Sequence, residues 1–94
     1  MNHYTLTWKS TVKHRYFSEM LLKAENLLKQ LDVLVLNSFG SAPLVHADTD
    51  TELCADNGFE VLVPNFNTAQ NIADWLAQVV GYPVTVTEIE ERSS

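Results

Sequence analysis

Histidine and carboxylate side chains alternate along the sequence from His46 onward. His46, Asp48 and Asp50 would lie on one side of an extended segment, and one nitrogen with two carboxylates suits a hydrated divalent cation. A calcium-binding loop is excluded, because its sixth position needs glycine and its twelfth needs glutamate, whereas the sequence has Leu53 and Phe59 there. We expect no metal or other cofactor, and keep a small-ligand, metal-binding or enzymatic domain centred on these three residues as an alternative.

The sequence has no arrangement typical of a catalytic nucleophile. Cys54 is the only thiol, and His46 lies eight residues away across an expected bend. We expect Cys54 to pack as an inert residue opposite Val61 in a hairpin. Only Glu60 and Asp74 have the apolar neighbours that a general acid needs, and we expect Asp74 on the exposed face of a helix. We therefore expect no catalytic residues.

The acidic residues are distributed unevenly along the chain of 94 residues, whose net charge is -6. Residues 1–30 carry five basic and two acidic side chains, whereas residues 31–94 carry ten acidic side chains and one basic. Direct binding to DNA or RNA needs a dominant positive field, so we expect a basic protein as the partner instead. The carboxylates that we expect to contact this partner are Asp48, Asp50, Glu52, Asp56, Glu88, Glu90 and Glu91.

This distribution of charge predicts a small, acidic, non-catalytic protein-binding module. By analogy with small antagonists from phages and mobile elements, such a module could act as an inhibitor that mimics DNA in the phosphate-binding groove of a nucleic-acid-binding protein. The same charges would also keep an ordinary domain soluble. A further alternative is a self-associating structural domain, a homo-oligomer that pairs an exposed sheet edge, near Leu44–Ala47 or in the last strand, with its copy.

The sequence has no segment typical of membrane insertion or export. Its longest apolar run, Val33–Leu36, is far shorter than the roughly 20 residues of a membrane-spanning helix. The first residues lack the basic and apolar regions of a signal peptide. A single cysteine and the absence of an Asn-x-Ser/Thr sequon suit a reducing cytosol. We expect a cytoplasmic protein that does not bind membranes.

The first third of the chain shows two kinds of apolar periodicity. Alternation of polar and apolar residues predicts a strand over residues 3–9. Ser10 and Thr11 then offer a break or a helix cap, and residues 12–16 fit either a strand or a helix. Apolar residues at helical spacing predict a helix over residues 17–31.

Short apolar runs predict the strands in the middle of the chain. Residues 33–36 are rich in β-branched side chains, which favours a central strand covered on both faces. A short strand is also expected over residues 44–47. The pair Asn57-Gly58 between residues 52–55 and 59–63 predicts a β-hairpin, because both residues tolerate a positive φ.

The last third of the chain carries signals for a helix and a strand. Asn67 and Gln70 have the spacing of a capping pair at the start of a second helix. Gly81 and Pro83 are placed to end that helix, and residues 84–89 read as a final strand.

Together these elements predict an α+β fold in one domain, residues 1–94, in the order β-α-β-(β)-β-β-α-β. This order is typical of a two-layer α/β sandwich, ferredoxin-like or related, with both helices on one face of a mainly antiparallel sheet of four or five strands. Phe39 and Phe66 fall in expected loops, where we interpret each as a lid on the core in preference to a binding anchor.

Overall fold

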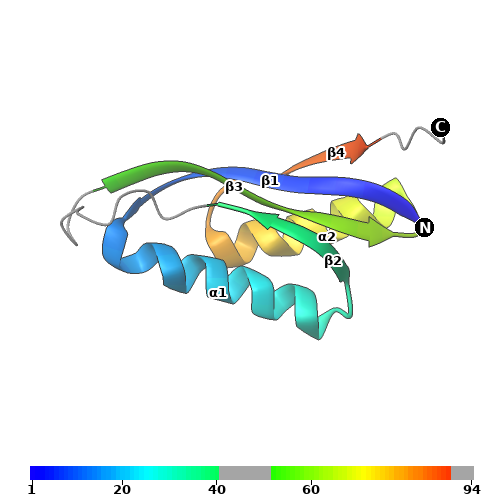
Figure 1. Cartoon of the computed structure of the whole chain (residues 1–94), viewed down its shortest axis with the longest axis horizontal. Helices are drawn as coiled ribbons and strands as arrows, with labels where there is room; N and C mark the ends of the chain where they lie inside the picture. Colours follow the sequence, from blue (N-terminus) through cyan, green and yellow to red (C-terminus); the bar gives the residue numbers. More distant parts are fainter. Residues whose placement is uncertain (41–51, 90–94) are drawn as a thin grey trace.

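The computed structural model describes residues 1–40 and 52–89, which form a sheet layer and a helix layer (Figure 1). The elements in chain order are β1 (Asn2–Lys13), α1 (His14–Gln30), β2 (Leu34–Phe39), β3 (Glu52–Val63), α2 (Phe66–Val80) and β4 (Thr85–Ile89). Within these residues the strands form one four-stranded sheet in the order β2-β3-β1-β4, and every neighbouring pair is antiparallel. Both helices cover the same face of the sheet, so the predicted α+β sandwich is confirmed.

The centre of the sheet is the long antiparallel pair β1 and β3, which are in register over all twelve residues of each strand. The hairpin expected at Asn57-Gly58 is wrong, because β3 runs straight through these residues. Asn57 lies opposite Trp8, and Gly58 lies opposite Thr7. Pairing along the whole of β1 therefore overrides the local preference of Asn-Gly for a tight turn.

Ser10 does not interrupt β1. Its side chain is buried at 1% exposure on the helix-covered face, where its Oγ accepts a hydrogen bond of 2.9 Å from Asn57 Nδ2. The bond satisfies one polar group of each residue and allows the strand to continue. Residues 12 and 13 consequently belong to β1, and α1 begins at His14 without a side-chain cap.

The core lies between the helices and the covered face of the sheet. Tyr4, Leu6 and Trp8 point into it from β1, as their alternation predicts. The apolar stripe of α1 packs over them from Phe17 onward. The other buried apolar residues are Met20, Ala24, Leu28, Phe59, Val61, Val63, Ala69, Ile72, Ala73, Leu76 and Val80.

The turn after α1 sends the chain directly into β2. Asp32 adopts a left-handed conformation with φ 54°, its N–H donates to Lys29 O at 3.1 Å, and the Val33 N–H donates to Leu28 O at 3.0 Å. These two bonds form a Schellman motif, and Leu28 and Val33 occupy the two positions at which this motif usually carries apolar residues. The motif fixes where β2 begins relative to the last turns of α1.

The apolar run at 33–36 is not a central strand, contrary to expectation. β2 lies at the edge of the sheet, pairs only with β3 among the described strands, and is exposed along most of its length. An uninterrupted apolar run is typical of a strand covered on both faces, so its position at an edge leaves apolar side chains in contact with solvent.

Helix α2 begins two residues earlier than the sequence predicts. Its cap is Asn65 in place of Asn67, and Asn65 Oδ1 accepts hydrogen bonds from the Thr68 N–H at 2.8 Å and the Thr68 hydroxyl at 3.0 Å. The predicted end is confirmed, since Gly81 follows the last turn in a left-handed conformation with φ 82°. Neither helix in the described ranges is long and apolar enough to cross a membrane.

The identity of this cap can be tested by a pair of substitutions. Asn65→Ala is expected to lower the free energy of unfolding by about 1 kcal/mol, because two donors of the first turn lose their acceptor. Asn67→Ala is expected to change it by less than about 0.5 kcal/mol, since Asn67 is exposed and makes none of these cap bonds. Urea unfolding of the two variants measures the difference, and a larger loss at position 67 would contradict the assignment.

Candidate functional site

The face of the sheet away from the helices, called the open face here, carries acidic residues opposite basic ones. Asp56 of β3 is exposed and lies opposite the exposed Lys9 of β1. Glu60 Oε2 lies 3.3 Å from His3 Nε2, and these side chains are 27% and 14% exposed. Cross-strand neighbours of opposite charge attract one another. The carboxylates of the open face thus lie beside cationic or ionisable partners.

The seven carboxylates predicted to bind a partner do not gather around one hairpin. Glu52 lies in β3 opposite Lys13, four residues before Asp56. Glu88 is exposed in β4, opposite Tyr4 and therefore on the other side of the sheet from Asp56. The remaining members lie outside the described residues: Asp48, Asp50, Glu90 and Glu91.

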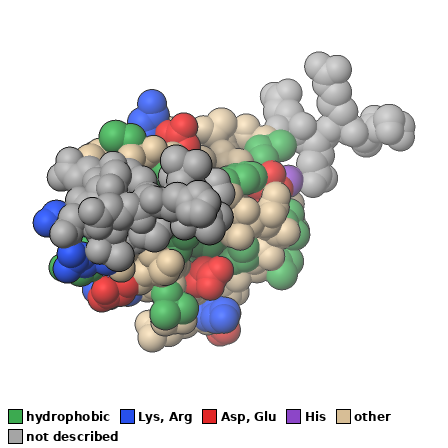
Figure 2. Space-filling model, turned by 60° about the vertical axis from the view of Figure 1, so that its left-hand side comes forward, with side chains coloured by type: hydrophobic (Ala, Val, Ile, Leu, Met, Phe, Trp, Pro, Cys, Tyr) green, Lys and Arg blue, Asp and Glu red, His purple; other side chains and the backbone are tan. Residues whose placement is uncertain are grey.

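The surface of the described residues carries both signs of charge. Figure 2 shows acidic and basic side chains interspersed over the face that it displays. Lys23 and Glu19, on neighbouring turns of α1, form an exposed ion pair of 3.3 Å. Interspersed charges favour solubility and give no single-sign field on this face.

The groups considered for catalysis or metal binding are also separated. Cys54 is exposed and lies opposite Thr11, with its Sγ 3.5 Å from Thr11 Oγ1, so the expected position opposite Val61 is wrong. Asp74 is exposed on α2 as expected and accepts a hydrogen bond of 3.1 Å from Gln70. His46 lies outside the described residues. Within the described ranges, no three His, Cys, Asp or Glu side chains are placed to hold a metal ion.

The two loop aromatics of the sequence prediction lie in different settings. Phe39 ends β2 and is half-buried opposite Gly58. Phe66 begins α2 with 50% of its surface exposed, and its ring meets the buried ring of Tyr4 edge-on at 6.2 Å between centroids. Phe66 therefore covers one end of the core with part of its ring, in agreement with its interpretation as a lid.

A hollow lies where β4 separates from β1. It has a volume of about 510 Å³ and is lined by Thr7, Trp8, Lys9, Asp56, Pro83 and Thr85. Its charged residues, Lys9 and Asp56, lie opposite each other in the β1–β3 register. The hollow is open to solvent, and its lining combines these charged groups with apolar surface.

The largest exposed apolar feature of the sheet is the edge strand β2. Three consecutive residues, Leu34, Val35 and Leu36, are 53%, 38% and 47% exposed. A register shift between Val35 and Asn37 places Leu36 in a bulge, so this part of the edge does not follow a regular alternation. Apolar residues on an unpaired strand edge are a template for pairing with another strand.

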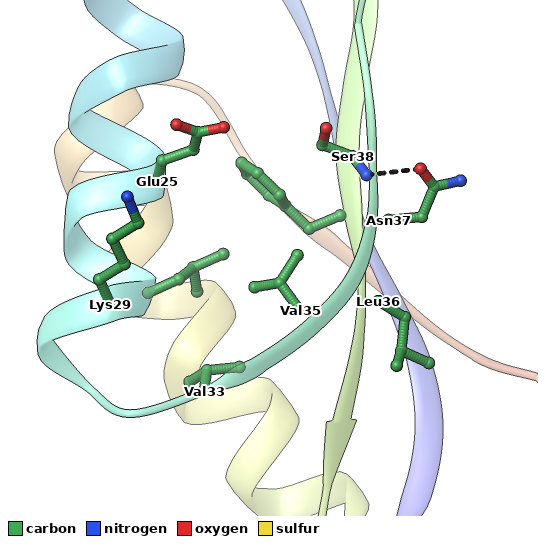
Figure 3. A pocket seen from close by; sticks show the side chains of 9 residues that line it. Glu25, Lys29, Val33, Val35, Leu36, Asn37 and Ser38 are labelled. Carbon is green, nitrogen blue, oxygen red and sulfur yellow. Dashed lines mark hydrogen bonds between the residues drawn. The ribbon is translucent and has the colours of Figure 1, made fainter.

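A groove runs between this edge and α1 (Figure 3). Its volume is about 400 Å³, and its apolar lining, called its floor here, includes Leu28, Val35 and Phe59. Glu25 and Lys29 of α1 form the opposite rim, and both are exposed. The groove thus has an apolar floor, a rim with one negative and one positive charge, and a strand edge as its other wall.

At the C-terminal end of β2, a side chain of the strand itself occupies a backbone donor that pairing would need. Asn37 Oδ1 accepts a hydrogen bond of 2.9 Å from the Ser38 N–H, and both side chains are drawn beside the groove in Figure 3. A side chain that satisfies a backbone donor of an edge strand competes with an incoming strand for that donor. The stretch that remains for pairing is the apolar one, Leu34–Leu36.

Sequence reasoning did not select this site, because it assigned residues 33–36 to the centre of the sheet. A comparison with models of known protein families gives no match, and a comparison with curated proteins gives none either. The functional argument accordingly depends on the geometry of the chain itself.

Proposed function

We propose that this chain is a non-catalytic protein-binding module, and that it binds its partner along the β2 edge surface. This surface consists of Leu34, Val35 and Leu36 together with the groove rim formed by Glu25 and Lys29. The observation that carries the proposal is the exposure of three consecutive apolar residues on a strand edge that pairs with no other strand of residues 1–40 and 52–89.

Both parts of this surface support binding of an extended strand. The β2 backbone offers hydrogen bonds on its outer side, and strand addition uses such bonds for affinity. The groove beside it accepts side chains of the added strand against Leu28 and Phe59, and burial of apolar surface contributes about 25 cal/mol per Å². Natural edges usually carry charges or prolines that prevent such contacts, whereas Leu34–Leu36 contain neither, and the bulge at Leu36 is the one protective feature of this stretch.

Site-specific photo-crosslinking in the cells that make the protein tests this proposal. A photoreactive residue in place of Leu36 is expected to give a protein adduct in high yield. The matched control replaces Trp75 of α2, which is 48% exposed compared with 47% for Leu36. Equal yields from the two positions, or no adduct from position 36, would contradict the proposal.

A basic protein held by carboxylates is a second candidate partner. It is favoured by the net charge of -6 and by the exposure of Asp56 and Glu88. A third arm of the experiment, with the photoreactive group in place of Asp56, tests it. An adduct from position 56 that disappears at high salt supports this candidate, and an adduct confined to position 36 rejects it.

We also propose a ferredoxin-like arrangement of the fold and a cytosolic location for the chain. The order β-α-β-β-α-β, with the sheet order β2-β3-β1-β4, supports a ferredoxin-like arrangement. The exposed Cys54, the only cysteine of the chain, supports a reducing cytosol as the working environment.

A further inference from the structure

We propose that Asn37 is a site of spontaneous deamidation in the folded chain, and that the fold protects Asn57, which is the more reactive of the two in an unfolded chain. The two side chains differ in how they lie relative to the backbone nitrogen of the next residue. The inference is independent of the proposed function, because it concerns a covalent reaction of the chain with water.

Deamidation of an asparagine begins with attack by the backbone nitrogen of the following residue. This nitrogen forms a bond to the side-chain Cγ, the Cγ–Nδ2 bond breaks, and Nδ2 leaves as ammonia with the proton of the attacking N–H. Water then opens the resulting succinimide at one of its two carbonyl carbons, which gives aspartate or isoaspartate. The reaction exchanges an amide for an acid and involves no oxidant or reductant.

The residue after the asparagine decides how easily its nitrogen can attack. A small residue hinders the nitrogen least, and glycine, which has no side chain, also restricts the backbone least. Of the seven asparagines in the chain, only Asn37 and Asn57 are followed by serine or glycine. Asn57 precedes Gly58, so it is expected to react faster than Asn37 wherever the chain is unfolded.

The side chain of Asn37 points forward along β2 to the nitrogen that attacks it (Figure 3). The Ser38 N–H donates to Asn37 Oδ1 at 2.9 Å, so the nucleophile is already in contact with the amide group. Both residues are exposed, and β2 pairs only with β3 among the described strands. Groups held in contact react faster than groups that must first meet, and solvent reaches this amide for the hydrolysis.

The side chain of Asn57 points in the opposite direction, back along β3. Its Nδ2 donates to Ser10 Oγ at 2.9 Å and to Ala55 O at 3.3 Å, which holds the amide toward residue 55 and away from the Gly58 nitrogen. Gly58 pairs with β1 on one side and with β2 on the other. Attack at Asn57 therefore requires that these side-chain bonds break and that the central strands open.

Burial adds a second barrier at Asn57. The attack moves negative charge onto Oδ1, and hydrogen-bond donors stabilise such a charge. Asn57 is 1% exposed, and its Oδ1 accepts no hydrogen bond from the described residues. At the exposed Asn37, solvent and the Ser38 N–H both supply donors. The fold thus inverts the order of reactivity that the sequence alone predicts.

The product of the reaction changes the end of β2. Aspartate and isoaspartate both place a carboxylate at position 37, which lies opposite Glu60 of β3. Like charges directly opposite each other weaken strand pairing. Asn37→Asp carries this charge without the isoaspartate linkage, so it is expected to lower the urea midpoint, and high salt is expected to restore part of the loss. An unchanged midpoint would reject the coupling to Glu60.

Mass spectrometry of the aged chain tests the inference. The purified protein is incubated in native buffer and in concentrated urea at the same neutral pH. Cleavage after glutamate then separates the two asparagines, because Glu52 lies between them in the sequence. Fragmentation of the peptides assigns each acid to its residue.

The expected result is a reversal of order between the two conditions. In urea Asn57 reacts first. In native buffer Asn37 is expected to react within about threefold of its rate in urea, since an exposed edge needs little opening. Asn57 is expected to react at least about a hundredfold more slowly than in urea, because the opening of core strands is that rare. Acid at position 57 before position 37 in native buffer, or equal protection of both, would overturn the inference.

Substitution of Ser38 tests the role of its nitrogen. Ser38→Pro removes the attacking N–H, which donates to Asn37 Oδ1 and not to β3, and edge strands tolerate proline at such positions. Ser38→Val keeps the N–H but hinders it with a branched side chain that suits a strand. Both variants are expected to slow deamidation of Asn37 in native buffer, whereas Ser38→Ala reacts like the unchanged chain. Circular dichroism checks the fold of each, and an unchanged rate in the folded variants would reject attack by the Ser38 nitrogen.

Discussion

Replacement of Phe17 by alanine is expected to lower the free energy of unfolding by about 3–5 kcal/mol. Phe17 is 1% exposed and belongs to the cluster that joins α1 to the covered face of the sheet. Its removal withdraws apolar surface from the core and leaves a cavity that the rigid β1–β3 pair cannot fill. A domain of this size has a total stability of about 5–15 kcal/mol, so the variant is close to the limit of folding.

The neighbouring Tyr16 provides the matched control for Phe17. It is also aromatic and lies in α1, but it is 51% exposed and has the Arg15 guanidinium 5.8 Å from its ring centre. Tyr16→Ala is expected to cost about 1 kcal/mol or less. Urea unfolding of both variants at the same low protein concentration measures both losses. Equal losses would contradict the assigned orientation of α1.

Gly58→Asn is expected to lower the free energy of unfolding by about 3 kcal/mol. A Cβ atom at position 58 would lie 2.6 Å from Leu6 O and 2.7 Å from Thr7 Cγ2, and real contacts of this kind are essentially never so short. The nearest of these atoms belongs to the backbone of β1, which is fixed by pairing on both sides. The two central strands would have to separate to accommodate the new side chain.

This substitution also distinguishes a straight β3 from a hairpin at the same residues. A tight turn would accept asparagine at position 58, because asparagine tolerates positive φ, and the loss would be a few tenths of a kcal/mol. Gly81→Asn is the control, since Gly81 has φ 82° and a Cβ there meets no atom within 4 Å. A loss at position 58 no greater than at position 81 would show that β3 turns at Asn57-Gly58.

Periodic features of the sequence predicted the parts of the fold that depend on one element alone. The alternation of Tyr4, Leu6 and Trp8 predicted the buried face of β1, because side chains of a strand point to alternate faces wherever the strand lies. Helical spacing similarly predicted the buried stripe of α1 from Phe17 onward. Gly81 predicted the end of α2, because few residues other than glycine adopt a left-handed conformation readily.

Features that depend on a partner strand were predicted wrongly. Asn57-Gly58 has the composition of a turn, yet Asn57 donates to the buried Ser10, and Gly58 is the residue that allows β1 to approach closely. Ser10 was interpreted as a break or a helix cap, because its hydrogen-bond partner lies 47 residues away in the sequence. Local composition describes what a segment can do alone and contains no information about a hydrogen-bond partner from another element.

The candidate site belongs to this second group. The uneven distribution of carboxylates in the sequence predicted an acidic binding site. The structure instead places Asp56 opposite Lys9, and Glu60 beside His3. The residues that form the β2 edge surface have no common motif. Glu25 and Lys29 meet Val35 at a groove only because the Schellman turn at Asp32 folds the strand back along the helix.

The sequence by itself determined the class of the fold, the buried faces of β1 and α1 and the end of α2, since each follows from the spacing of residues within one element. Only the tertiary structure decided that β3 is continuous and that residues 34–36 lie at an edge of the sheet. The physical reason is that an apolar run has the same local conformation at the centre and at the edge of a sheet. Its exposure depends on which other strands pair beside it, and that order is set by packing of the whole chain.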